Sequence, residues 1–85
     1  MKTFETALEA RKIIDDLEIM SKRINYNPQI SVYLHNLSKM VSSLSSTEVL
    51  VRQTKKHHLL DKPKKELAEA IDYFEKLLLI QMLAE

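Results

Sequence analysis

Adjacent histidines are the first side chains in this sequence whose chemistry suggests a site. His57 and His58 are neighbours, His35 lies on another segment, and the chain has no cysteine. Two metal ligands on one helix meet at a single ion when they are four residues apart, whereas adjacent side chains point about 100° apart. We therefore expect solvated histidines near a helix end, and neither a metal site nor a cofactor.

Carboxylates gather at Asp15, Asp16 and Glu18, where paired acids could serve as general acid and base. That role requires a cleft that holds the carboxyl groups in unlike environments. The three residues fall off the apolar stripe that includes Ile13 and Leu17, so we expect a solvated face. No serine or threonine has a local histidine partner in a glycine-bearing turn, and the sequence offers no catalytic residue.

The third candidate is the basic segment, residues 52–65 (RQTKKHHLLDKPKK). It holds six of the 13 lysines and arginines and one acid, Asp61. Such a cluster is typical of a contact with an acidic protein, a nucleic-acid backbone or a membrane surface. The competing interpretation is local, because cations stabilise a helix C-terminus and Glu66 and Glu69 can neutralise others. The candidate binding residues are Arg52, Lys55, Lys56, His57, Lys62, Lys64 and Lys65.

The C-terminal stretch of residues 77–83 (LLLIQML) has more apolar side chains than one helix face can hold. Six of its seven residues are strongly apolar. One stripe must serve the core, and Leu79 and Ile80 point away from at least part of that stripe. Either the helix is central in the fold, or the two residues contact a second subunit or another protein. We therefore add Leu79 and Ile80 to the candidate binding residues.

Length and composition limit the classes of protein that fit. A chain of 85 residues is expected to form one domain with a modest core. The absence of glycine excludes phosphate-binding loops, dinucleotide-binding turns and nucleophile elbows, which need its backbone freedom. The N-terminal residues lack the apolar region of a signal peptide, and the longest apolar run, residues 77–80, is far shorter than the about 20 residues that cross a bilayer. We expect a cytoplasmic protein without a transmembrane segment.

Apolar periodicity predicts the helices that position these residues. The first covers about residues 3–24 and ends where Asn25 can adopt the left-handed conformation. The second begins at Pro28, with Asn27 as its N-cap. The last begins near residues 61–63 and carries the C-terminal apolar stretch.

The segment over residues 44–59 allows two interpretations. Ser45 and Glu48 have the spacing of a capping box, which predicts that the second helix ends near Ser43 and a third covers about residues 46–59. The alternative is one continuous helix over residues 28–59, because serine and threonine are tolerated on the solvent side of a helix. We expect the break. The fold is then a small all-α, antiparallel up-down bundle of four helices, or of three if residues 28–59 are continuous.

The leading functional hypothesis is a small non-enzymatic protein–protein interaction module: a regulator, inhibitor, adaptor or chaperone-like subunit. Surplus apolar surface beside charged residues suits a protein partner, a homo-oligomer or both. The alternative is a nucleic-acid-binding regulator that uses the basic segment. The formal net charge of +1 and the lack of aromatic residues within that segment count against it. A membrane-surface or immunity-type helical bundle is a further alternative.

Overall fold

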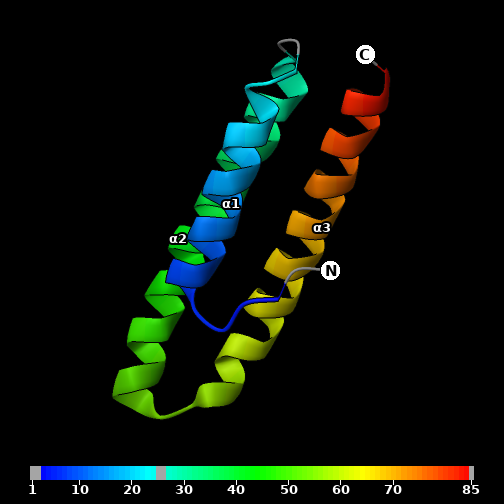
Figure 1. Cartoon of the computed structure of the whole chain (residues 1–85). Helices are drawn as coiled ribbons and strands as arrows, with labels where there is room; N and C mark the ends of the chain where they lie inside the picture. The colour runs from blue at the N-terminus through cyan, green and yellow to red at the C-terminus, as the bar shows by residue number, and fades with distance from the viewer. Residues whose placement is uncertain (1–2, 25–26, 85) are drawn as a thin grey trace.

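The computed structural model describes residues 3–24 and 27–84 of the chain (Figure 1). These residues form three α-helices, α1 (Ala7–Ser21), α2 (Pro28–Thr54) and α3 (Asp61–Ala84), and one 3₁₀-helix, η1 (His57–Leu60). No strand occurs in the two ranges. The α-helices run alternately up and down in Figure 1, so that α2 is antiparallel to both of its neighbours. The all-α class is confirmed, with three α-helices rather than four.

α1 begins at Ala7 rather than at about Thr3, because Thr6 caps it. Thr6 has an extended backbone, and its Oγ1 accepts a hydrogen bond from the Glu9 N–H at 3.2 Å. Residues 3–6 therefore leave the helix axis and cross toward α3 (Figure 1). Phe4 packs against the core from this extended segment.

In the connection between α1 and α2, the predicted start of α2 is observed. Asn27 Oδ1 accepts a hydrogen bond from the Gln29 N–H at 2.9 Å, and Pro28 occupies the first helical position, where its missing N–H costs nothing. This N-cap is confirmed. α1 ends at Ser21, and the predicted left-handed residue Asn25 lies outside the described residues.

α2 is a single helix of 27 residues, so the predicted break at residues 44–46 is wrong. Ser46 Oγ donates a hydrogen bond to the Ser42 carbonyl at 3.2 Å, and Thr47 Oγ1 donates to the Ser43 carbonyl at 3.0 Å. Hydroxyl groups that bond one turn back along the helix are compatible with its interior. The serine-rich stretch is therefore a solvent-facing part of α2 and not a helix boundary.

The predicted capping box of Ser45 and Glu48 is wrong for a related reason. Glu48 Oε2 accepts a hydrogen bond from the Ala7 N–H at 2.9 Å, across 41 positions of sequence. Ala7 is the first residue of α1, whose N–H lacks a partner within its own helix. Glu48 thus caps α1 from the C-terminal third of α2, and its carboxylate also opposes the positive end of the α1 dipole.

α2 ends at Thr54, five residues before the predicted Leu59, because Lys55 adopts a left-handed conformation with φ of 63°. The Lys55 N–H donates to the Val51 carbonyl at 2.7 Å and closes the helix. A third helix over residues 46–59 is therefore also wrong. The stretch without apolar residues after Val51 covers the last residues of α2, the two-residue link 55–56 and the start of η1, and Leu60 packs against the core from η1.

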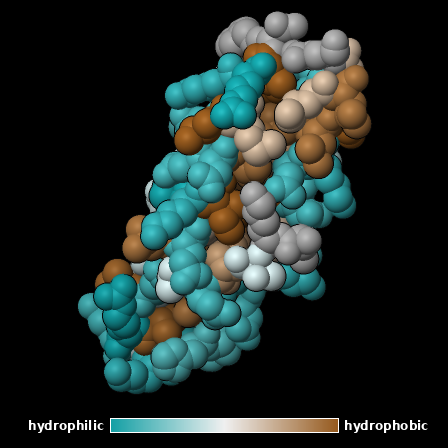
Figure 2. Space-filling model, viewed as in Figure 1, coloured by the Kyte–Doolittle hydropathy of each residue, from teal (hydrophilic) through white to brown (hydrophobic). Residues whose placement is uncertain are grey.

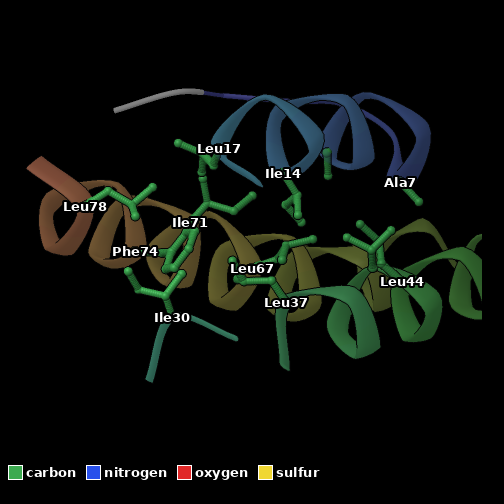
Figure 3. Close-up of a cluster of buried hydrophobic side chains, with 12 residues drawn as sticks. Ala7, Ile14, Leu17, Ile30, Leu37, Leu44, Leu67, Ile71, Phe74 and Leu78 are labelled. Atoms are coloured by element: carbon green, nitrogen blue, oxygen red, sulfur yellow. The ribbon is translucent and has the colours of Figure 1, made fainter. Parts of the chain in front are cut away.

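The core is a single apolar cluster to which all three α-helices contribute (Figure 3). α1 packs chiefly on α2, and α2 also packs on α3 and η1. Phe74, Leu67 and Leu44 of the core cluster are completely buried. The molecule measures 48 × 19 × 16 Å, so this core is long and thin. The buried side chains of the cluster are Ala7, Ala10, Ile14, Leu17, Ile30, Leu37, Val41, Leu44, Leu67, Ile71, Phe74 and Leu78.

Candidate functional site

The structure separates the predicted site residues into two groups. The basic segment forms the turn between α2 and α3, at the lower end of the molecule in Figure 1. Arg52 lies in the last turn of α2, His57 in η1, and Lys62 in the first turn of α3. Leu79 and Ile80 lie toward the other end of α3, at least about 21 Å farther along it at about 1.5 Å per residue. The two groups therefore cannot contact the same small area of a partner.

Ion pairs occupy part of the basic segment. Lys64 Nζ lies 3.9 Å from Glu5 Oε2, with the lysine side chain 30% exposed and the glutamate 87%, so this pair joins the N-terminal segment to α3 at the surface. Lys62 Nζ lies 4.0 Å from Glu66 Oε1, and both side chains are largely exposed. Such an exposed pair contributes about 0–1 kcal/mol. The structure thus gives Lys64 a structural contact.

Four cations of the basic segment make no ion pair within the two described ranges. They share exposed side chains and positions at the end of the molecule, and they are Arg52, Lys55, Lys56 and Lys65. Figure 2 shows a largely hydrophilic surface at this lower end. The arrangement presents positive charge to solvent, and Arg52 and His57 also line an open depression of about 410 Å³ beside α1.

The histidines remain on the surface. His57 and His58 are exposed in η1, and His35 is exposed on α2. Among the described residues, no three histidine or carboxylate side chains lie close enough to hold a metal ion. Asp15 and Asp16 are likewise exposed on α1.

The second group belongs to an exposed apolar surface at the C-terminal end of α3. Leu79 is 47% exposed and Ile80 61%, as the sequence predicted for side chains off the core stripe. Met82 and Leu83 are also exposed, at 43% and 88%. We call these four residues the α3 apolar end. Hydrophobic residues cover this part of the surface in Figure 2, at the upper right.

A groove between α2 and α3 was missed by the sequence reasoning. It has a volume of about 440 Å³ and a mostly apolar lining. A second depression of about 400 Å³ adjoins it along α2 and shares Tyr33 and Asn36 with it. We call the first depression the α2–α3 groove. Its lining residues are Tyr33, Asn36, Leu37, Met40, Glu66, Glu69, Ala70 and Tyr73.

Two tyrosines from different helices meet in the groove. The ring centroids of Tyr33 and Tyr73 are 5.7 Å apart at an interplanar angle of 54°, and Tyr33 also lies 6.2 Å from buried Phe74. A side-chain hydrogen bond to Tyr73 raises the pKa of Tyr33 above 10.0, and charge repulsion between the two phenolates raises it further. The pair links α2 to α3 while Tyr73 stays 56% exposed.

Two of the groove residues share the apolar face of α2. Tyr33 and Met40 lie at helical spacing from the buried residue Leu37. The structure leaves them half-buried at the margin of the core. An apolar stripe that is wider than the area covered by the two neighbouring helices predicts partly exposed side chains at its edge.

The chain matches no protein-family model, no curated protein and no solved structure. Its described helices include none with the length and apolar character needed to span a membrane. The candidate function therefore depends on the basic segment, the α3 apolar end and the α2–α3 groove.

Proposed function

We propose that the chain is a small, non-enzymatic, cytoplasmic interaction module that binds a protein partner through the α3 apolar end. It acts as a regulator, inhibitor, adaptor or chaperone-like subunit. The observation that supports this is the exposure of four large apolar side chains within residues 79–83 of one helix. Water is displaced favourably when such side chains are covered, at about 25 cal/mol per Å² of apolar surface.

The experiment compares the wild-type chain with a variant in which Leu79→Gln and Ile80→Gln are combined. Glutamine is a good helix former, so the change removes apolar surface without disfavouring α3. The matched control is Leu8→Gln, because Leu8 is 68% exposed on α1. Partners are captured from native lysate and quantified, and self-association is measured by sedimentation equilibrium.

We expect the double variant to lose the partner or the homo-oligomer by about tenfold or more in affinity, while Leu8→Gln retains it. Far-ultraviolet circular dichroism should be the same for all three proteins. Equal binding by the double variant would refute the proposal. Loss of helicity in the double variant would mean that the two residues stabilise the fold instead.

The second candidate is contact with a nucleic-acid backbone through the basic segment. The specific observation that favours it is the set of four exposed cations at one end of the molecule that make no ion pair with the described residues. A variant that tests it neutralises Arg52, Lys55, Lys56 and Lys65 and keeps Lys64, which pairs with Glu5. Duplex binding that weakens steeply with salt, and that this variant abolishes, would support it. Absence of binding at low salt would exclude it.

A further inference from the structure

The α2–α3 groove is an open apolar surface on the side of the bundle that α1 leaves uncovered. The N-terminal region contacts the other sides of both helices, since Arg11 Nη1 donates to Ser38 Oγ of α2 at 3.1 Å and Glu5 pairs with Lys64 of α3. On α2, Ser38 lies five residues from Tyr33, or about 140° around the helix axis. The groove therefore faces away from α1.

An apolar line along α3 extends the groove toward the C-terminal end of the helix. Tyr73, Leu77 and Ile80 are spaced by four and three residues, so their side chains lie on one helix face. Tyr73 lines the groove, Leu77 is half-buried, and Ile80 is exposed. The groove and this line together span about 21 Å of α3, from Glu66 to Ile80, at about 1.5 Å per residue.

Acidic side chains border the other end of the groove. Glu66 and Glu69 both line it, and none of the described residues that line it is basic. Lys62 contacts Glu66 only at 4.0 Å and in solvent, and Glu69 makes no ion pair with any described residue. A partner that fits this surface is therefore apolar along its length and positively charged at one end.

We propose that the α2–α3 groove binds an amphipathic α-helix of a protein partner, with aliphatic side chains at i, i+3 or i+4, and i+7 and with lysine or arginine beside Glu66 and Glu69. This inference rests on the proposed function and specifies the partner. The aliphatic side chains lie against Tyr33, Met40 and Tyr73, and the cations pair with the two carboxylates.

A second copy of the chain is a poorer occupant than a basic helix. Parallel two-fold pairing on the groove places Glu66 and Glu69 opposite the same residues of the other copy, and antiparallel pairing places Glu66 near the apolar end; neither brings a cation from the groove lining to the two carboxylates. Lys62 of the basic segment reaches Glu66 only at 4.0 Å and in solvent, so it neutralises little of this negative charge.

The test uses two synthetic helical peptides of about 18 residues, enough to cover the groove at about 1.5 Å per residue. Both carry the same aliphatic stripe and lack aromatic residues and methionine. One has lysines beside the stripe and the other has glutamates. Binding to the full chain is followed by NMR of ¹³C-methyl-labelled methionines, because Met40 lines the groove while Met82 belongs to the α3 apolar end and Met20 lies on α1.

We expect the lysine peptide to shift Met40 and leave Met20 unchanged, and to bind about tenfold or more tightly than the glutamate peptide. Glu66→Gln with Glu69→Gln should reduce that preference to less than about threefold. Ile80→Gln should weaken binding about tenfold, whereas the control Leu8→Gln, at an exposed leucine of α1 outside the groove, should weaken it less than about twofold.

Three results would overturn the inference. The first is no shift at Met40 with about 1 mM lysine peptide, and the second is equal affinity for the two peptides. If the first result came with a shift at Met82, the proposed function would still stand. The third is a Met40 shift that depends on protein concentration alone, together with a dimer by sedimentation equilibrium, because a second copy would then occupy the groove.

Discussion

Replacing Ser46 with proline tests whether α2 is continuous, because the two interpretations of this segment predict opposite results. If a new helix began after Ser45, residue 46 would be its first position, where proline is favoured. In the structure residue 46 lies 18 positions into a helix of 27 residues. Proline there removes the hydrogen bond from its own N–H to the Ser42 carbonyl, and its ring collides with that carbonyl.

The expected cost follows from this position. Proline in a helix interior destabilises by about 3 kcal/mol, and a bend at residue 46 also displaces Glu48 from the Ala7 N–H, at about 1 kcal/mol more. A chain of 85 residues has a free energy of unfolding of about 4–13 kcal/mol in total. The change therefore removes a large fraction of it, and the melting temperature should fall by about 12 °C or more.

The assay is urea and thermal denaturation followed by circular dichroism, with Ser46→Ala as the control. The control removes the hydroxyl that bonds the Ser42 carbonyl and keeps the helix, so it should be at least as stable as the wild type, by up to about 0.5 kcal/mol. If Ser46→Pro unfolded within about 0.5 kcal/mol of Ser46→Ala, a continuous α2 would be refuted.

Three further predictions concern single contacts. Glu48→Ala should destabilise the chain by about 1–2 kcal/mol in urea denaturation, because the partly buried N–H of Ala7 loses its acceptor. A neutral effect would mean that another group caps α1. Lys55→Gly should stabilise it by about 1 kcal/mol in the same assay, since glycine adopts positive φ without a Cβ clash, and destabilisation would contradict the left-handed assignment. Hydrogen bonding to Tyr73 raises the pKa of Tyr33, so the folded chain keeps the phenol proton of Tyr33 to a higher pH than the unfolded chain does. The stability that results is present below about pH 10 and is lost as the pH rises further. Tyr73→Phe should lower the pKa of Tyr33 in an NMR titration of the rings, and an unchanged midpoint would exclude the hydrogen bond as its cause.

Local signals in the sequence were sufficient where the cap and its helix are adjacent. Asn27 and Pro28 specify a helix start within three residues, and the acceptor and the donor both belong to that stretch. Glu48 shows the limit of this reasoning. A carboxylate three residues after a serine fits a capping box, yet its donor in the structure is Ala7, which no local pattern connects to it.

The helix count explains why the groove was missed. With four helices, the wide stripe of α2 would be covered on both sides, and Tyr33 and Met40 would belong to the core. With three, α1 covers one side of the α2–α3 pair and the other side stays open. The exposure of Leu79 and Ile80 was predicted correctly, because off-stripe positions depend only on helical periodicity and not on the number of neighbours.

The elongated outline of the molecule has a consequence for its behaviour in solution. Its radius of gyration is 14.0 Å, whereas a compact chain of 85 residues would have about 12 Å. A rod of 48 × 19 × 16 Å experiences more friction than a sphere of the same mass, and it tumbles faster about its long axis than end over end. A single copy of this 9.9 kDa chain therefore elutes from a sizing column earlier than its mass suggests, as a heavier globular protein would. Light scattering or sedimentation equilibrium, which report mass independently of shape, distinguishes that monomer from a true pair.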